Sequence, residues 1–214
     1  MADLAKEVQT KKYVALTFDD GPNTTTTVEV LDKLEKYGVI ASFFVIGDYI
    51  NTTTKAIVHR AFRMGCEIDN HSKTHSVMPE LTKEDIVSEL QFTLDKVKAI
   101  TGTETPFFRP PYIEVDDRML ELIELPFICG YGCKDWEDDV TVEERFQSVM
   151  DQMTDGNIVL LHDLEGNNKT VQALDLIIPA LLEQGYTFVT VSELFAKKGI
   201  QPKKSFVYSN VLDQ

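Results

Sequence analysis

Five short polar segments hold most of the side chains that could do chemistry. They are Asp19-Asp20, His71-Ser72-Lys73-Thr74-His75, Arg109-Pro110-Pro111-Tyr112, Asp135-Trp136 and His162-Asp163. Carboxylates and imidazoles are the groups that serve as general acids, general bases and metal ligands. Three of the 4 histidines lie in these segments. The fourth, His59, falls within a predicted helix with no histidine or carboxylate partner nearby in sequence, so we interpret it as a surface residue.

The first two segments could form a metal site. His71 and His75 are four positions apart, one helical turn, so both imidazoles can face one ion. One carboxylate and two imidazoles leave an open position on a divalent metal, as in catalytic sites. Such a metal makes water more acidic and polarises an acyl oxygen. Taken alone, Asp19-Asp20-Gly21-Pro22 could instead be a tight turn, and the histidine pair could be solvated.

The remaining segments could supply acid–base catalysis. A second carboxylate beside a metal ligand can act as a general base, and Arg109 could keep it ionised. His162 could protonate a leaving group if a nearby carboxylate raises its pKa. Taken alone, Arg109 could pair with a surface carboxylate, and His162 could be a hydrogen-bonded core residue. Together the segments contain every role that a hydrolytic site needs.

Alternating apolar runs and amphipathic segments must position these side chains. The predicted strands are 13–17, 41–45, 67–68, 107–108, 127–129, 158–161 and 187–189. The predicted helices are 27–37, 53–64, 81–100, 117–124, 142–153, 170–184 and 191–198. The Thr residues before position 27 and Thr82 are candidate helix N-caps. Glycines that follow helical segments are candidate left-handed C-caps, namely Gly38, Gly65, Gly102, Gly185 and Gly199.

This alternation predicts an α/β fold with a parallel sheet and right-handed crossovers. About seven such units in one domain suggest a closed or nearly closed barrel. An open, doubly wound sheet remains an alternative, although the chain has no glycine-rich nucleotide-binding loop. Each polar segment follows a predicted strand, at the end where α/β barrels assemble their active sites.

The composition is that of a globular protein, and we expect one domain over residues 1–214. The formal net charge of −14 disfavours nucleic acid and anionic membranes as partners. No run of 18 apolar residues predicts membrane insertion. Residues 1–12 lack the apolar core of a signal peptide, so a secretion signal is absent or has been removed. The cysteines, Cys66, Cys129 and Cys133, are odd in number and favour buried free thiols over a disulfide framework.

The polar segments, in this order, resemble the five motifs of carbohydrate esterase family 4, the polysaccharide deacetylases (the NodB homology domain). The resemblance runs from about Val14 to about Leu194. Its first and last motifs are Thr17-Phe18-Asp19-Asp20-Gly21-Pro22 and Leu160-Leu161-His162-Asp163. It implies a distorted (β/α) barrel with about seven parallel strands. It also implies metal-dependent removal of acetyl groups from an acetylated polysaccharide or oligosaccharide.

The resemblance further implies roles for single residues. Asp19 would be the general base, held by Arg109. Asp20, His71 and His75 would bind one divalent metal ion, usually zinc, with cobalt or nickel accepted.

Five further residues would complete the site. His162 would be the general acid, tuned by Asp135. The backbone N–H of Tyr112 would stabilise the oxyanion. Trp136 and Leu160 would line a small pocket for the acetyl methyl group, although ordinary core packing would also explain them.

Three positions depart from the family pattern. Ile113 follows the tyrosine of the third motif where glycine is common, which affects the adjacent subsite. Asp69 adds a negative charge before the metal histidines, and Gly132 replaces an acidic residue.

The acetylated substrate is less clear than the reaction. The segments 174–179 and 188–195 are similar to the acetylxylan esterase branch, which favours O-acetyl xylan. The intact segment Arg109-Pro110-Pro111-Tyr112 is instead typical of N-deacetylases, which act on N-acetylglucosamine in peptidoglycan or chitooligosaccharides. A metal-free hydrolase of small amides and a non-catalytic carbohydrate-binding protein are further alternatives, and each predicts a broken ligand or catalytic set. Relatives that degrade polymers imply an extracellular or cell-surface location.

Overall fold

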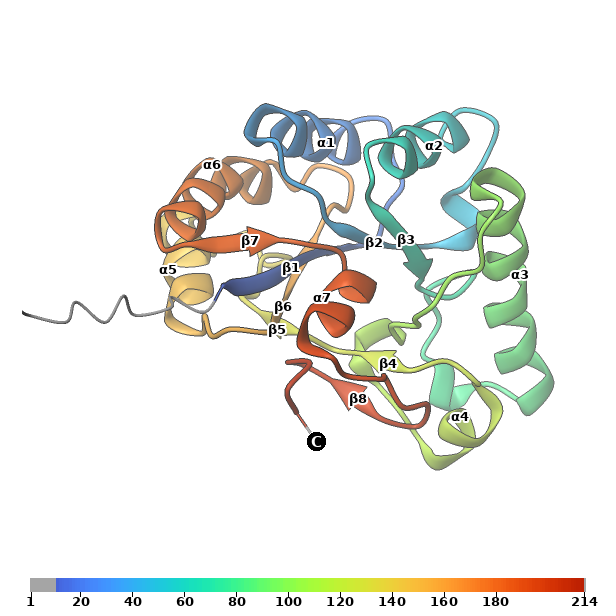
Figure 1. Cartoon of the computed structure of the whole chain (residues 1–214). Helices are drawn as coiled ribbons and strands as arrows, with labels where there is room; N and C mark the ends of the chain where they lie inside the picture. Colours follow the sequence, from blue (N-terminus) through green and yellow to red (C-terminus); the bar gives the residue numbers. More distant parts are fainter. Residues whose placement is uncertain (1–10, 214) are drawn as a thin grey trace, which may run out of the picture.

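The computed structural model describes residues 11–213 (Figure 1). The strands are β1 (Lys12–Asp19), β2 (Ser42–Val45), β3 (Glu67–Asn70), β4 (Phe127–Ile128), β5 (Tyr131–Gly132), β6 (Asn157–His162), β7 (Tyr186–Phe188) and β8 (Val207–Tyr208). The α-helices are α1 (Thr26–Tyr37), α2 (Lys55–Arg63), α3 (Lys83–Thr101), α4 (Asp117–Leu122), α5 (Val142–Asp151), α6 (Asn168–Glu183) and α7 (Val191–Lys198). The 3-10 helices are η1 (Gly47–Tyr49), η2 (Met78–Glu80) and η3 (Pro111–Ile113).

The strands form a parallel, strongly curved sheet. Its order is β3-β2-β1-β6-β5, and β7 pairs with the first part of β1. A bridge through Phe108 joins Asn70 of β3 to Phe127 of β4, and β4 pairs with β8. Beyond β8, Asn210 bridges back to Asn157 of β6. These connections confirm the predicted α/β class. They also arrange the strands as a nearly closed barrel.

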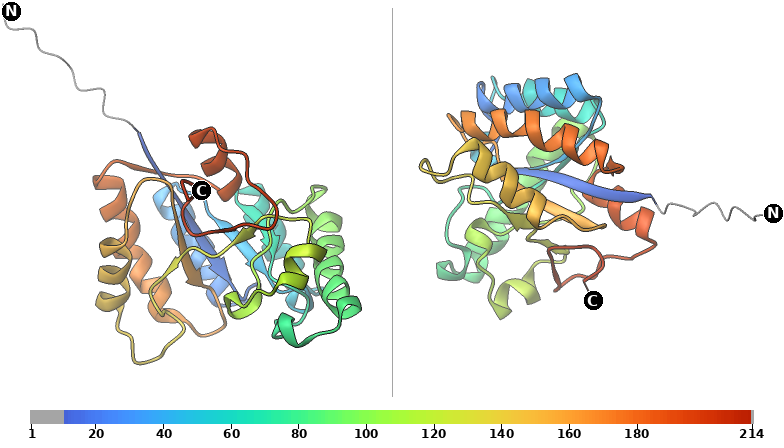
Figure 2. Two further views of the ribbon diagram at one scale, coloured as in Figure 1. Left: turned by 90° about the horizontal axis from the view of Figure 1, so that it is seen from below. Right: turned by 90° about the vertical axis from the view of Figure 1, so that its left-hand side faces the viewer.

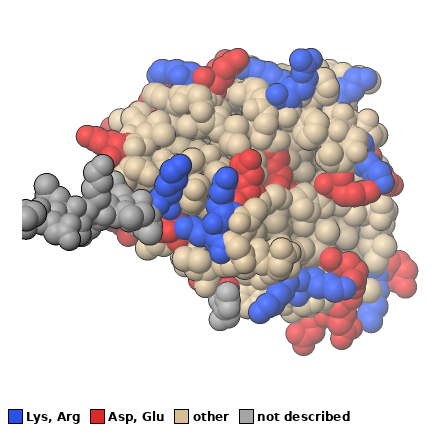
Figure 3. Space-filling model, in the orientation of Figure 1, with Lys and Arg blue, Asp and Glu red and all other residues tan. Residues whose placement is uncertain are grey.

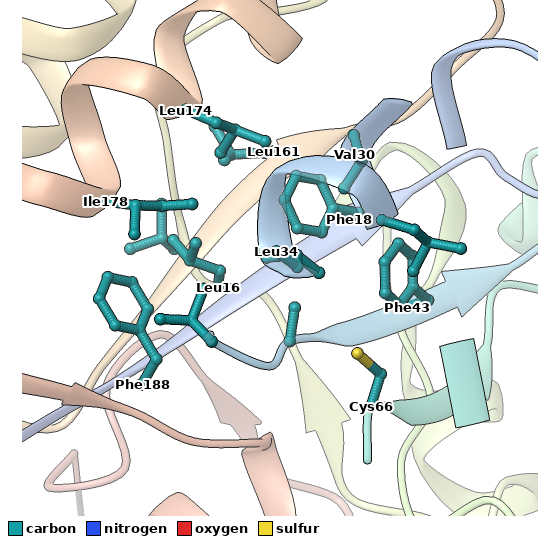
Figure 4. Packing of buried hydrophobic residues seen from close by; sticks show 14 of the residues in the cluster. Leu16, Phe18, Val30, Leu34, Phe43, Cys66, Leu161, Leu174, Ile178 and Phe188 are labelled. Atoms are coloured by element: carbon teal, nitrogen blue, oxygen red, sulfur yellow. The ribbon is translucent and has the colours of Figure 1, made fainter. Parts of the chain in front are cut away.

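Alternate residues of β1 face opposite sides of the sheet, as the two-residue period of a strand requires. Leu16 and Phe18 pack outward against Val30 and Leu34 of α1 and against α6 (Figure 4). Helices α1 and α6 lie side by side over this face (Figure 2). Ala15, the residue before Leu16, belongs instead to an inner cluster with α7. This alternation directs Asp19, at the end of the strand, toward the inside of the barrel.

Most predicted elements are confirmed, with differences at their ends. The predicted strand at 107–108 is wrong, because only Phe108 forms a bridge there. Strands β5 and β8 were not predicted. Thr82 caps α3 by accepting the N–H of Asp85, but Thr25 before α1 makes no side-chain cap. All five glycines predicted to follow helices have positive φ, and Gly38, Gly102 and Gly199 are left-handed C-caps.

On the face in Figure 3, basic and acidic groups are interspersed among uncharged residues. Within residues 11–213, none of the helices combines the length and the apolar character needed to cross a bilayer.

Candidate active site

The carboxyl ends of the strands bring the polar segments together. Asp19 ends β1 and His162 ends β6, and the two residues are paired in register. His71 follows β3, and Arg109 follows the Phe108 bridge. The predicted grouping of side chains at one end of the sheet is therefore confirmed.

The fourth segment reaches this end by a different strand from the one expected. Asp135 and Trp136 follow β5 and not the strand predicted at 127–129. The chain turns at Gly130, whose positive φ of 90° suits glycine, and β5 then pairs with β6 beside Leu160. This short strand carries Asp135 to His162.

Three side chains form a candidate metal site. Single ligand atoms of Asp20, His71 and His75 all lie within 4.8 Å of one another. Oδ1 of Asp20 is 3.4 Å from Nε2 of His71 and 3.3 Å from Nε2 of His75. The buried Oδ1 has no hydrogen-bond donor among the described residues. One carboxylate oxygen and two imidazole nitrogens suit a divalent ion with an open coordination position.

The protonation states also favour a cation. Burial alone would raise the pKa of Asp20, but the adjacent His71 side chain, with smaller effects of His162 and His75, lowers it. Burial and the charge of His71 lower the pKa of His75. An ionised carboxylate and a neutral imidazole are the forms that bind metal.

The spacing argument for the two histidines was wrong, because the segment from His71 to His75 is not helical. Ser72 and His75 instead have φ values of 64° and 62°, which turn both imidazoles toward Asp20. Nδ1 of His71 is hydrogen-bonded to the backbone carbonyl of Arg109 at 2.7 Å, which leaves Nε2 as the nitrogen that could bind a metal ion.

The loop between the two histidines is held by Glu89 of α3. Its carboxylate accepts the backbone N–H groups of Lys73 and Thr74 at 2.9 and 2.8 Å, and the Thr74 hydroxyl at 2.9 Å. Glu89 was not identified from the sequence. The available signal was a carboxylate on the buried face of α3, in line with Ile86 and Thr93.

Asp19 and Arg109 form a buried ion pair. Nη1 of Arg109 donates to Oδ1 of Asp19 at 2.5 Å, and neither side chain is more than 2 % exposed. Nε of Arg109 donates to the carbonyl of Ile128, and the guanidinium lies over the ring of Phe44. Oδ2 of Asp19 points toward the candidate metal site, 3.7 Å from Nε2 of His71.

Asp135, which is buried, and His162, which is partly buried, form a second pair. Oδ1 of Asp135 contacts Nδ1 of His162 at 2.8 Å, and Oδ2 accepts the His162 backbone N–H at 2.8 Å. Burial opposes a charged imidazole, but the hydrogen bond and charge of Asp135 raise the pKa of His162 to about 9. His162 is therefore an imidazolium at neutral pH, with Nε2–H as its free donor.

Two hollows meet at the candidate metal site. The smaller, about 390 Å³, has apolar walls, and its lining residues are Asp20, His71, His75, Tyr112, Ile113, Trp136, Leu160 and His162. The ring of Trp136 stands edge-on to that of His162, with centroids 5.2 Å apart. The larger, about 870 Å³, is a polar groove that shares Asp20, His75 and Tyr112 with the smaller one.

The tyrosine of the third motif sits on a strained turn. Tyr112 and Ile113 both have a φ of 58°. The Tyr112 ring is 61 % exposed and stands edge-on to that of His75 at 4.6 Å. Ile113, at the position where glycine is common in the family, lines the smaller hollow.

Asp163 contacts the segment that contains Asp19 and Gly21. Its backbone N–H donates to the carbonyl of Asp19, and Oδ2 accepts the Thr27 hydroxyl at 2.5 Å. A Cβ at Gly21 would lie too close to Oδ2 of this carboxylate, so a larger residue there would have to displace Asp163. Burial, opposed by Thr27 and reinforced by Asp20 and Asp19, raises the pKa of Asp163 to about 7.

Comparison with known proteins agrees with this geometry. A family model described as polysaccharide deacetylase matches residues 6–125. A bifunctional xylanase/deacetylase of Pseudobutyrivibrio xylanivorans is 48 % identical over 204 residues, covering 95 % of this chain and 34 % of that protein. The peptidoglycan-N-acetylmuramic acid deacetylase PdaC of Bacillus subtilis is 35 % identical over 187 residues, covering 86 % of this chain and 39 % of that protein.

A solved structure is also similar. It is a family 4 acetyl xylan esterase from Clostridium thermocellum in complex with a cobalt ion, with a TM-score of 0.91 and 40 % identity, covering 94 % of this chain and 100 % of that one. The chain spans less than half of the length of the two curated relatives. With a matching family model and a 48 % identical relative, the chain belongs to the polysaccharide deacetylases, hydrolases that typically depend on a divalent metal.

Proposed function

We propose that this chain removes O-acetyl groups from a neutral, xylan-type polysaccharide. The observation that carries the choice of substrate is the polar groove beside the candidate metal ligands. Among residues 11–213, no lysine or arginine lines this groove. Its charged residues are the carboxylates of Asp20, Asp48 and Glu165. An anionic glycan would meet repulsion there, whereas a neutral sugar chain would not.

Asp20, His71 and His75 would hold one divalent ion, with zinc the best match to a carboxylate and two imidazoles. The buried Oδ1 of Asp20, which lacks a donor among the described residues, supports this fit. When bound, the ion supplies Lewis acidity, which makes a water molecule more acidic and polarises an acyl oxygen.

Asp19 would be the general base. Arg109 occupies Oδ1 and keeps the carboxylate oriented, so that Oδ2 is left to accept a proton from the attacking water. Because Oδ2 lies 3.7 Å from Nε2 of His71, the proton would be accepted close to the metal ligands.

His162 would be the general acid on the other side of the acetyl carbon. Asp135 binds Nδ1 and raises the pKa to about 9, so Nε2 carries a proton to give to the leaving oxygen. The backbone N–H of Tyr112 would support the oxyanion. Trp136 and Leu160 would surround the acetyl methyl group in the smaller hollow.

The relatives support a xylan substrate. The 48 % identical protein is a xylanase/deacetylase, and the 40 % identical solved structure is an acetyl xylan esterase. The second candidate is N-deacetylation of N-acetylglucosamine, which is favoured by the strongly raised pKa of His162, because an amine leaves only when protonated.

The test measures acetate release from acetylated xylan and from N-acetylglucosamine oligomers, with zinc, with cobalt and with EDTA. Metal-dependent release from xylan alone supports the proposal, and release from the oligomers alone replaces it with the second candidate. Absence of metal-dependent release from both would contradict both assignments.

A charge reversal tests the groove. Glu165→Lys should increase the rate on an acidic acetylated glycan relative to a neutral one, because it adds a cation to the lining. Glu183→Lys is the matched control, since it makes the same change in net charge at the exposed far end of α6. Equal effects of the two variants would remove the electrostatic argument for a neutral substrate.

A further inference from the structure

Helix α5 carries a buried arginine that has no counter-ion among residues 11–213. Arg109 and Arg145 are 0 % and 2 % exposed. Arg109 pairs with Asp19, whereas Arg145 has no ion pair within residues 11–213. Burying a guanidinium costs free energy unless its N–H groups find hydrogen-bond acceptors. The acceptors of Arg145 therefore indicate which part of the structure it stabilises.

Arg145 joins two segments that flank Asp135. Nε donates to the carbonyl of Val140 at 3.2 Å, and Nη2 donates to that of Glu137 at 2.9 Å, both in the loop that follows Trp136. Nη1 donates to Oδ1 of Asn167 at 2.6 Å and to Oγ1 of Thr170 at 2.9 Å, at the start of α6.

The direction of these hydrogen bonds is forced. A guanidinium only donates, so Thr170 Oγ1 must accept from Arg145, and its single hydrogen is left for Oδ2 of Asp135 at 2.8 Å. Asn167 likewise accepts through Oδ1, which turns Nδ2 toward the carbonyl of His162 at 2.9 Å. Arg145 therefore sets the orientation of both groups that hold the Asp135–His162 pair.

We propose that Arg145 is a positioning residue for the general acid. It does not reach the hollow itself, but acts through Thr170 and Asn167 on Asp135, and so fixes the aim of Nε2 of His162. This inference rests on the proposed role of His162. Its chemical consequence is specific, because an ill-placed acid slows only those reactions whose leaving group needs a proton.

The test compares two leaving groups in the metal-loaded protein. Arg145→Met removes every donor, and Thr170→Val removes one hydroxyl with little change of shape. On acetylated xylo-oligosaccharides we expect both variants to lower kcat by about 10- to 100-fold with a smaller change in KM. On 4-nitrophenyl acetate, whose phenolate leaves without protonation, the loss should be several times smaller.

Val149→Ala is the control for general destabilisation, because Val149 is a buried residue of the same helix that packs in the core. It should affect the two substrates by equal factors. If Arg145→Met and Thr170→Val also do so, the positioning role is wrong. His162→Ala tests the general acid separately from Arg145. If this variant loses the same factor on both substrates, the assignment of His162 as general acid is wrong. If His162→Ala alone loses more activity on the xylo-oligosaccharides than on 4-nitrophenyl acetate, only the role of Arg145 is wrong.

Discussion

Arg109 holds one oxygen of Asp19 inside the barrel, with Nη1 2.5 Å from Oδ1. The pair is buried, so removing either partner leaves an uncompensated polar group, which typically costs about 3–5 kcal/mol. Because Oδ1 is engaged, the remaining oxygen is the one that faces the candidate metal site. The ion pair thus selects which oxygen of the carboxylate is free for chemistry.

Asp19→Asn should therefore bind metal and lose activity. A side-chain amide cannot accept the proton of the attacking water, so acetate release should fall by about 10²- to 10⁴-fold. Parallel titration of zinc by calorimetry should give binding close to that of the parent, because Asp20, His71 and His75 are unchanged. Normal turnover by this variant would place the base elsewhere.

His71→Ala should abolish tight metal binding. It removes the ligand whose Nε2 lies 3.4 Å from Asp20 and whose Nδ1 is fixed by the Arg109 carbonyl. Two remaining ligands do not hold an ion in an open site. Metal content after dialysis checks this result, with His59→Ala, an exposed position on α2, as the control. Stoichiometric metal in His71→Ala would contradict the ligand assignment.

The pH dependence should follow the Asp135–His162 pair. The acid must be protonated, so kcat on acetylated xylan should decrease as the pH rises through about 9, the raised pKa of His162. Asp135→Asn removes the partner that raises this pKa, and the decrease should move to lower pH. A basic limb that does not move would show that another group carries the proton.

The same pair predicts a stability change in the metal-free protein. The pKa of His162 rises from 6.5 to about 9 on folding, so the folded state binds the proton more tightly. This contribution to the free energy of unfolding is complete below about pH 6.5 and is lost as the pH rises through about 9. Denaturant titrations between these values should give a shallower pH slope for Asp135→Asn than for the parent.

The grouping of the polar segments was predictable because the strands are parallel. Their carboxyl ends meet at one edge, so residues such as Asp19, His71 and His162 had to approach one another once their strands were recognised. The helical reason for pairing His71 with His75 was wrong, since positive φ angles in a loop bring them together. The four-residue spacing of the two histidines is compatible with a helical turn and with this loop, so the spacing alone could not distinguish them.

The supporting residues were not predictable by the same means. Glu89 and Arg145 lie on helices, where a charged side chain normally faces water. Their burial depends on acceptors or donors from distant segments, such as Thr170 for Arg145 and the 73–74 loop for Glu89. Periodicity along one helix contains no information about such partners. Short strands that exist only through pairing, such as β5 and β8, were missed for the same reason.

We expect Ile113 to lower the stability of the protein through its backbone conformation and to contribute to substrate binding through its side chain. A β-branched residue with a φ of 58° is strained by about 1–2 kcal/mol, and glycine adopts this conformation freely. Glycine also loses about 0.5–1 kcal/mol more backbone entropy on folding, so Ile113→Gly should raise the Tm slightly. The isoleucine side chain lines the smaller hollow, so the same variant should raise KM for acetylated xylo-oligosaccharides.

Ile113→Ala is the matched comparison. Alanine loses the same apolar surface from the hollow but keeps a Cβ, and with it most of the backbone strain. KM should therefore rise in both variants, whereas the Tm should rise only with glycine. A lower Tm for both would mean that the turn is not strained and that Ile113 contributes through packing alone. An unchanged KM in both would exclude its side chain from the wall of the acetyl site.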